Sequence, residues 1–565
     1  MTPGFLATLV ALVACLALAW RYLGSYMVAV YEGRVRWLSF VERPLYRLLG
    51  TDPDAEQSWQ RYALSLLVFS GVSILVTYAI LRAQGSLPLN PQHLKGVTPA
   101  LAWNTSVSFV TNTNWQNYVG ESTMSYFSQM VALAVQNFVS PAVGMLVAIA
   151  LIRGFARRSA SLIGNFWVDL VRSVIYVLLP ISSVFALVFI AQGAVQTLGG
   201  PAHIHDVLNH VSQTIPRGPV ASQEAIKQLG TNGGGYFNAN GAHPFENPTG
   251  LTNFLSILLL LAVPVALTYT FGKMVGNIRH GVAVLAAMVI LFGAWLTVTV
   301  VAEQGHNPAV SAAGLVHQPH GNMEGKETRF GASSSALYGV ASTQTSTGSA
   351  DSSYDSYTPL GGLGLMAGMA QGDITPGGVG SGMYTILLSA IIAVFIGGLM
   401  VGRTPEYLGK KIQAREVKLA AFGVLVMPVT VLVLTGIAVG LPAGTSAVLN
   451  KGPHGFAEIF YAFLSQGNNN GSAFAGLSGN SAFYNITGGI DMLLGRFGVI
   501  VPVLALAGVL AKKGIVPASL GTFRTDSPMF VGLLVGVIVL IGALTFFPAI
   551  SIGPIVEQLL HGRFF

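Results

Sequence analysis

The sequence has 565 residues, of which 52% are hydrophobic and only 9% are charged. Soluble domains average about a quarter charged residues, so this composition excludes an ordinary soluble protein of this length. A single cysteine, Cys15, excludes a disulfide framework and a cysteine-based metal cluster. The net charge of +7 reflects where the basic residues stand along the chain, and we expect no nucleic-acid partner.

Long apolar runs bounded by charged clusters recur along the chain. A run of about 20 residues crosses the hydrocarbon core of a bilayer as a helix. The runs predict an all-α, polytopic membrane protein with about ten transmembrane helices. These are expected near residues 5–20, 62–81, 127–152, 170–190, 251–271, 281–301, 383–401, 419–441, 492–510 and 529–550.

The first apolar run, residues 5–20, also has the length of a secretory signal peptide. Signal peptides carry their positive charges before the apolar run, whereas here the basic residues begin after it, at Arg21. We therefore predict an uncleaved first span whose N-terminus lies outside.

Basic residues are concentrated in alternate connections between the predicted spans. Examples are Arg157 and Arg158 after the third span and Lys512 and Lys513 after the ninth. The positive-inside rule places these loops in the cytoplasm. Because the number of spans is even, both termini are then predicted to lie outside.

The outer connections contain a fourfold repeat. Each is longer than a link between two helices requires, and each holds a moderately apolar segment followed by a polar cluster. The apolar segments are residues 102–110, 222–229, 333–341 and 455–464. We predict four repeats of span, pore helix, filter loop and span around one pseudo-fourfold pore, with an extra span at each end. The expected boundaries are 1–60, 61–158, 159–279, 280–415, 416–513 and 514–565.

The polar clusters that follow the pore helices suit a dehydrated monovalent cation. Irregular backbone at membrane depth is tolerated only where it lines a water-filled cavity or is buried in protein. Rings of backbone carbonyls replace the hydration shell of K⁺ without burying a formal charge. Glycine and asparagine reach the required backbone angles most readily. The clusters contain no Asp or Glu, which argues against a divalent ion.

Five stretches give the chain a specific resemblance to a known family. They are residues 110–116, 230–235, 322–327, 402–411 and 468–477. The chain resembles the KdpA family, the potassium-binding subunits of bacterial Kdp potassium-transporting P-type ATPases. That family belongs to the superfamily of K⁺ transporters, which is related in design to tetrameric potassium channels.

The resemblance implies a potassium filter in the four loops. It pairs Asn112 and Thr113 of the first loop with Asn232 and Gly233 of the second. The third loop departs from the family pattern, since Thr347 stands where a cysteine is expected; its backbone carbonyl remains, so we expect the filter to survive. The implied filter residues are Thr111, Asn112, Thr113, Thr231, Asn232, Gly233, Ser346, Thr347, Gly348, Asn469, Asn470 and Gly471.

A charge inside an apolar run is the second candidate feature. Arg496 lies within residues 492–498, at a depth where a charge is costly and usually functional. Related transporters carry an arginine at this place, which implies a positive gate below the filter. The alternative is a structural ion pair with Asp491.

Two further features flank the implied filter. The glycines Gly378, Gly380 and Gly382 are predicted to break the second helix of repeat three after a first half at residues 360–370, and family members use such a break as a gate. The alternative is a loose loop before the helix. Gln116 is expected at the outer mouth, where it helps to set the ring, or else is a simple turn residue.

The chain lacks the sequence features of an ATPase. It has no Asp-Lys-Thr-Gly motif and no Walker A loop, so we expect no ATP hydrolysis and no nucleotide or organic cofactor in this subunit. The resemblance implies a separate KdpB-like catalytic subunit, with KdpC-like and KdpF-like accessory subunits, in the lipid bilayer of the bacterial inner membrane. K⁺ would enter the filter from outside and move sideways through a tunnel into the catalytic partner.

Other functions remain open at this point. A stand-alone K⁺ channel or an ion-coupled K⁺ symporter of the same superfamily would have the same fold without an ATPase partner. A scaffold subunit with an inactive filter is a third possibility. The stretch 402–411 favours the Kdp subunit over the other transporters of the superfamily.

Overall fold

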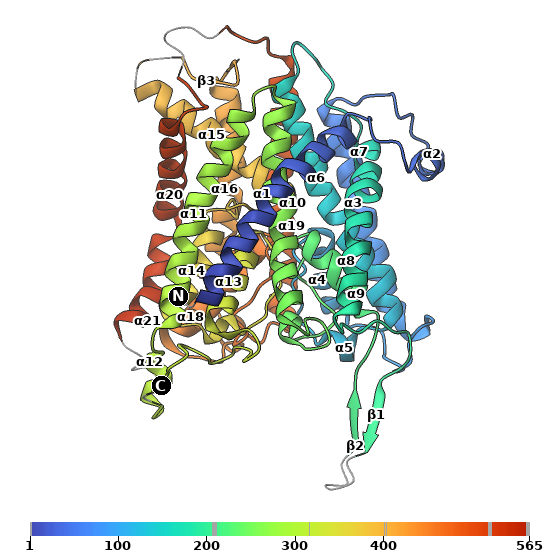
Figure 1. Ribbon diagram of the computed structural model, residues 1–565, viewed down its shortest axis with the longest axis vertical. Coiled ribbons are helices and arrows are strands. Elements are labelled where there is room, and N and C mark those ends of the chain that lie inside the picture. The colour runs from blue at the N-terminus through green and yellow to red at the C-terminus, as the bar shows by residue number, and fades with distance from the viewer. Residues whose placement is uncertain are drawn as a thin grey trace.

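The computed structural model describes residues 3–205, 212–315, 317–400, 402, 404–517 and 523–560. Arg403 belongs to the stretch 402–411 that contributes to the family resemblance, and it lies outside the described residues. In the described part of the chain, ten helical segments are long and apolar enough to cross a membrane. Figure 1 shows these helices standing side by side in one bundle.

All ten predicted spans are present. They are formed by α1 (Pro3–Tyr31), α3 (Trp59–Ala83), η2 (Ser128–Ala134) with α6 (Val135–Ala156), α7 (Phe166–Arg172) with η3 (Ser173–Leu178) and α8 (Leu179–Ala191), α10 (Gly250–Met274), α11 (Ile278–Gln304), α15 (Ser381–Met400), α16 (Ala414–Gly440), α19 (Ala482–Lys512) and α20 (Pro528–Ile550). The ninth span begins about ten residues before the predicted 492, because Asn485 and Asp491 interrupt its apolar run although both are buried in the protein.

The spans divide into a central and a peripheral group. In α6 and α10, 83% of the most apolar window is buried, whereas only 11% is buried in α1 and 22% in α3. Exposed apolar side chains on the outer helices are the surface that lipid covers. The extra span α1 packs along α10, and Gly24 permits this close approach: a Cβ there would lie 2.7 Å from the Cβ of Tyr269.

The four predicted pore helices are also present. They are α4 (Pro99–Val110), α9 (Val220–Leu229), α13 (Gly331–Thr343) and α18 (Gly452–Gly467). All four lie in the half of the bundle that carries the hairpin of β1 (Ala202–His205) and β2 (Ser212–Ile215) (Figure 1). Each is flanked by two spans, which confirms the predicted architecture of four repeats.

The predicted break in repeat three is present as well. Its second helix is divided into α14 (Pro359–Ala370) and α15, and residues 371–380 between them are not helical. Gly378 and Gly380 lie in this break segment. Gly382 does not, because it belongs to the first turn of α15, where the absence of a side chain lets the Pro376 carbonyl approach.

The two ends of the bundle differ in composition. At one end, β3 (Glu406–Tyr407) and β4 (Lys410–Lys411) form a hairpin among the basic loops. There the Lys410 ammonium donates hydrogen bonds to the carbonyls of Arg157, Leu510 and Lys513, which joins three repeats. At the opposite end lie the start of α1, the end of α21 (Val556–Leu559) and the β1–β2 hairpin (Figure 1).

Short elements complete the described chain. They are α2 (Ser39–Leu48), η1 (Gln84–Ser86), α5 (Gly120–Thr123), β1 (Ala202–His205), β2 (Ser212–Ile215), η4 (Asn240–Ala242), α12 (Pro308–Ala312), η5 (Tyr354–Ser356), α17 (Pro442–Thr445), η6 (Ser551–Ile555) and α21 (Val556–Leu559).

Candidate ion filter and gate

The four pore helices end in the same way. In each, one residue near the end takes a positive φ, between 49° and 69°, and the next N–H bonds to the carbonyl five residues earlier. This is the Schellman type of helix ending, in which a left-handed residue reverses the chain. The left-handed residues are Asn112, Thr231, Ser346 and Asn469, and the residues that follow them are Thr113, Asn232, Thr347 and Asn470.

This shared ending corrects the predicted pairing of the first two loops. Thr113, not Asn112, is equivalent to Asn232, so Asn114 is equivalent to Gly233. Asn114 has a φ of 56°, and both Gly233 and Gly471 have a φ of 93°. Asparagine is among the few side chains that tolerate this region. By the same comparison Thr111, which caps α4, is equivalent to Gly230, which caps α9.

The first three loops contact one another through hydrogen bonds. The Asn112 side chain donates to the carbonyl of Thr231 at 3.1 Å. The Gly348 N–H donates to the carbonyl of Asn232 at 3.3 Å. Loop one is thus joined to loop two, and loop two to loop three.

The fourth loop closes the circle. A Cβ on Gly348 would lie 2.8 Å from the carbonyl carbon of Gly471, so loops three and four meet backbone to backbone. A Cβ on Gly471 would lie 1.9 Å from the Thr113 carbonyl oxygen. The Asn469 side chain also donates to the Thr113 hydroxyl at 3.0 Å. Four segments far apart in the sequence therefore form one closed ring, and only glycine fits at its tightest contact.

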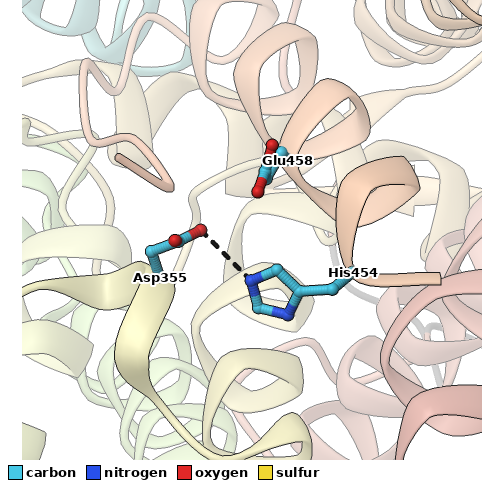
Figure 2. Close-up of side chains that lie close together, drawn as sticks. All are labelled: Asp355, His454 and Glu458. Carbon is cyan, nitrogen blue, oxygen red and sulfur yellow. Dashed lines mark hydrogen bonds and ion pairs between the residues drawn. The ribbon is translucent and has the colours of Figure 1, made fainter. Parts of the chain in front are cut away.

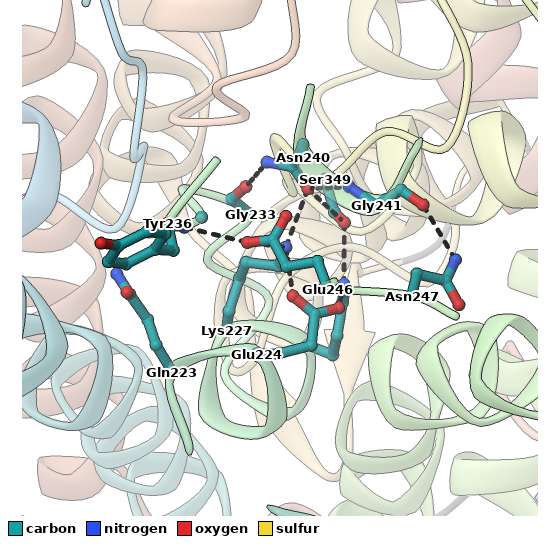
Figure 3. Close-up of polar contacts among 12 residues, drawn as sticks. Gln223, Glu224, Lys227, Gly233, Tyr236, Asn240, Gly241, Glu246, Asn247 and Ser349 are labelled. Carbon is teal, nitrogen blue, oxygen red and sulfur yellow. Dashed lines mark hydrogen bonds and ion pairs between the residues drawn. The ribbon is translucent and has the colours of Figure 1, made fainter. Parts of the chain in front are cut away.

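A buried polar network supports this ring from behind (Figure 3). The Asn240 side chain donates to the Gly233 carbonyl at 2.5 Å and accepts from the Lys227 ammonium at 2.8 Å. Lys227 is fully buried and forms ion pairs with Glu224 and Glu246. Burial raises the pKa of Glu246 above its usual range, and Lys227 opposes this rise. Both acids are buried, although each stands in a polar connection between two spans.

Gln116 joins the first two loops close to the ring. Its side-chain amide donates to the Gly235 carbonyl at 3.0 Å and accepts from the Gly235 N–H at 3.1 Å. This reciprocal pair links two repeats, which is more than a simple turn residue requires.

The break segment of repeat three runs against the other side of the ring. Its Asp373 accepts a hydrogen bond from the Asn470 side chain at 3.1 Å, and its Val379 N–H donates to the Thr231 hydroxyl at 3.0 Å. Asp373 is 2% exposed and was not predicted as a site residue. The available signal was an isolated acid between two apolar segments.

Arg496 lies beside the break segment. It is 3% exposed, and its guanidinium donates to the Ser140 carbonyl on α6 at 2.8 Å. A Cβ on Gly144 would lie 3.6 Å from that guanidinium and 2.3 Å from the Val379 carbonyl oxygen.

The suggested ion pair between Arg496 and Asp491 is absent from the described residues. Positions five apart on an α-helix are turned by about 140° from one another, so the two side chains leave α19 in different directions. The Asp491 carboxylate is buried and instead lies close to the Thr430 side chain of α16.

A cavity extends sideways from the ring. Its lining includes Asn112 and Ser346 from the filter loops, Arg496 from α19, and Ile541 and Thr545 from α20. Because α20 stands at the rim of the bundle (Figure 1), the cavity connects the inner side of the ring to the bundle periphery.

Comparison with known proteins is consistent with this architecture. The family described as "KdpA: Potassium-transporting ATPase A subunit" matches residues 10–559. Two curated relatives are named "Potassium-transporting ATPase potassium-binding subunit". The relative from Methylococcus capsulatus is 55% identical over 576 residues, and that from Mesorhizobium japonicum is 56% identical over 549 residues; each alignment covers 96% of both chains.

A solved structure is similar in fold. The potassium transporter TrkH from Vibrio parahaemolyticus matches with a TM-score of 0.50 and 15% sequence identity. The match covers 79% of this chain and 84% of that chain. At this identity the likeness concerns the fold alone.

Proposed function

Because this multi-pass membrane chain belongs to the family of potassium-transporting ATPase A subunits, we propose that it selects K⁺ from the outer solution and passes it to a separate catalytic subunit. The coarser role, a potassium-transport subunit of such an ATPase, follows from the family. The closed ring of four loops carries the finer proposal, because four converging backbone segments can replace the hydration shell of one ion.

The proposed filter consists of three residues from each loop. They are Asn112, Thr113 and Asn114; Thr231, Asn232 and Gly233; Ser346, Thr347 and Gly348; and Asn469, Asn470 and Gly471. Their backbone carbonyls supply oxygen ligands without a formal charge, which suits a monovalent ion.

The unusual Thr347 is compatible with this filter. Its hydroxyl lies 2.9 Å from the Thr345 hydroxyl and 3.1 Å from the Thr345 carbonyl. In the first loop, the Thr113 hydroxyl lies 2.8 Å from the Thr111 hydroxyl in the same way. Thr347 thus repeats an arrangement that another loop of the same ring already uses, which supports a working third loop.

We propose that Arg496 and the break segment form the gate. A buried guanidinium repels a cation that leaves the filter toward the cytoplasm, since like charges interact strongly where water is scarce. The cavity that reaches Thr545 offers a sideways route to a partner beside α20. Gly378 and Gly380 lie where a backbone movement would open or close the inner side of the ring.

The proposed assembly contains a KdpB-like catalytic subunit and KdpC-like and KdpF-like accessory subunits in the bacterial inner membrane. The end of the bundle that carries the basic loops is proposed to face the cytoplasm. The pore helices then lie in the outer half of the membrane, and both termini lie outside.

Uptake of radioactive rubidium into ATP-loaded vesicles tests this function. The chain is reconstituted alone and then with the candidate ATPase subunits. Uptake that requires both the partners and ATP supports the pump subunit. Equal gradient-driven uptake by the chain alone would favour a channel or symporter, and no uptake in either case would favour an inactive scaffold.

A matched pair of variants links uptake to the ring. Gly471→Ala places a Cβ against the Thr113 carbonyl, whereas Gly276→Ala changes a glycine of similar φ, 80°, with open space around it. Only the first substitution is expected to abolish uptake.

A further inference from the structure

Figure 2 shows the imidazole of His454 beside the carboxylates of Asp355 and Glu458. His454 stands in the first turn of α18. Its Nε2 lies 3.2 Å from Asp355 in the loop of repeat three, and its Nδ1 lies 2.9 Å from Glu557 in α21. Glu458 stands one turn further along α18. The ligand atoms of Asp355, His454 and Glu458 all lie within 4.8 Å of one another.

The spacing explains why these groups converge. His454 and Glu458 are four residues apart on one helix, so both side chains leave the same face. Asp355 approaches that face from a different repeat. One imidazole nitrogen and two carboxylate oxygens are a ligand set that Zn²⁺ accepts, with water in a fourth position. Atoms bound at about 2 Å from one ion lie roughly 3–4 Å apart, so only small side-chain shifts separate this cluster from a closed site.

Glu557 completes the environment of the imidazole. A metal-bound histidine characteristically hydrogen-bonds a carboxylate through its other ring nitrogen, which fixes the ring orientation. Here Glu557 accepts that bond at Nδ1 while Nε2 faces Asp355 and Glu458.

The cluster carries an excess of negative charge in a largely buried place. Glu458 is 0% exposed, and the side chains of His454, Asp355 and Glu557 are 12%, 14% and 13% exposed. Within the described chain, no lysine or arginine forms an ion pair with these three acids. Buried charges require a partner, and one imidazole does not balance three carboxylates.

The cluster is accessible without passage through the ring. A cavity on this side of the bundle is lined by Asp355, His454 and Glu557, together with Asn307 and Glu324. An ion in the adjacent solution can therefore reach the imidazole directly.

We propose that Asp355, His454 and Glu458 bind a divalent transition-metal ion of the Zn²⁺ class, with Glu557 as the residue that orients His454. The bound ion joins the repeat-three loop, the fourth pore helix and, through Glu557, the C-terminal helix α21. Phe474, three residues after Gly471, lies between the rings of His454 and Tyr461, with centroid distances of 5.9 and 4.3 Å. The site is thus in packing contact with the fourth filter loop. The proposal does not depend on the proposed transport function.

Zn²⁺ binding to the purified full-length chain, after removal of metal with a chelator, tests the site. Equilibrium dialysis is expected to show one Zn²⁺ bound per chain, and Mg²⁺ at the same concentration is not expected to compete. His454→Gln, which keeps most of the side-chain volume, is expected to weaken binding by at least about tenfold, and Glu557→Gln by a similar factor. Because Glu458 also accepts hydrogen bonds from the backbone of Leu449 and Asn450, the histidine variant is the decisive one.

His203→Ala is the matched control, since His203 is an exposed histidine on the β1–β2 hairpin at the same end of the bundle. It is expected to bind Zn²⁺ as the wild type does. A thermal-unfolding midpoint that rises with Zn²⁺ in the wild type and in His203→Ala, but not in His454→Gln, supports the site and establishes that the variant is folded. Absence of stoichiometric binding, or equal binding by His454→Gln, overturns the proposal.

Discussion

The side chain of Gln116 forms a two-way hydrogen-bonded pair with the backbone of Gly235, at 3.0 and 3.1 Å. The pair resembles the exchange between two paired strands, although one partner is a side chain. It joins repeats one and two next to the ring. The contact between these two repeats therefore depends on one amide group with both a donor and an acceptor.

Gln116→Leu is expected to raise the KM for rubidium uptake by about five- to thirtyfold, because the two hydrogen bonds with Gly235, of about 1 kcal/mol each, are lost along with the one that the amide donates to the Tyr118 hydroxyl. The maximal rate is expected to change little. Gln92→Leu is the control, since the Gln92 side chain donates a hydrogen bond to the Glu121 carbonyl, which lies outside the four filter loops. An unchanged KM in Gln116→Leu would remove Gln116 from the filter.

Asn240→Ala is expected to weaken potassium binding and to destabilise the protein by about 1–3 kcal/mol. The substitution leaves the Gly233 carbonyl and the Lys227 ammonium without a shared partner in a buried place. Rubidium binding by the purified chain and its thermal-unfolding midpoint measure the two effects. The exposed Asn238→Ala should change neither quantity.

Arg496→Gln is expected to permit rubidium leak without ATP. The substitution keeps a donor toward the Ser140 carbonyl but removes the charge. Arg496→Lys retains the charge and should leak less. The rate of passive rubidium efflux from loaded vesicles distinguishes the variants. If Arg496→Gln leaks rubidium no faster than the wild type, the role of the arginine is structural only.

Thr347→Cys is expected to change the affinity for rubidium by less than about twofold. The Thr347 hydroxyl is directed toward Thr345, so the ion is expected to meet the backbone of this loop. Competition between rubidium and sodium in the binding assay provides the measurement. A large loss of selectivity for rubidium over sodium would contradict the assignment of the Thr347 backbone carbonyl as the ion ligand of this loop.

The stability of the protein is expected to fall as the pH rises from about 4 to 7. Burial raises the pKa of Asp351 to about 7, so the folded state binds this proton more tightly than the unfolded state, in which an aspartate has a pKa near 3.9. The stabilisation is complete below the unfolded pKa and is lost as the pH passes through the folded pKa. Asp351→Asn should flatten the pH dependence of the unfolding midpoint, and the exposed Asp54→Asn should not.

The spans and pore helices were predictable because they depend on local composition. Apolar runs determine where a helix can cross lipid, and the polar cluster after each short helix marks where it ends. The start of α19 was missed for the same local reason, since Asn485 and Asp491 interrupt its apolar run.

Relationships between the loops were not predictable from local patterns. The equivalence of Asn114 and Gly233 appears only when the backbone of both helix endings is compared. Asp373 lies beside the fourth loop because the fold brings it within hydrogen-bond distance of Asn470, 97 positions later in the sequence. Arg496 likewise finds its partner, Ser140, 356 positions away. Such contacts are set by packing of the whole bundle.

The buried Lys410 of the β3–β4 hairpin is surrounded by backbone carbonyls, as an ion in the proposed filter would be. Three carbonyl oxygens lie 2.5, 3.1 and 2.6 Å from the Lys410 ammonium, which is a monovalent cation fixed to its own chain. The protein therefore uses one kind of coordination in two ways. At the proposed filter the carbonyls are expected to surround an ion that passes through, whereas here they bind an ammonium group that is covalently part of the chain and joins three repeats.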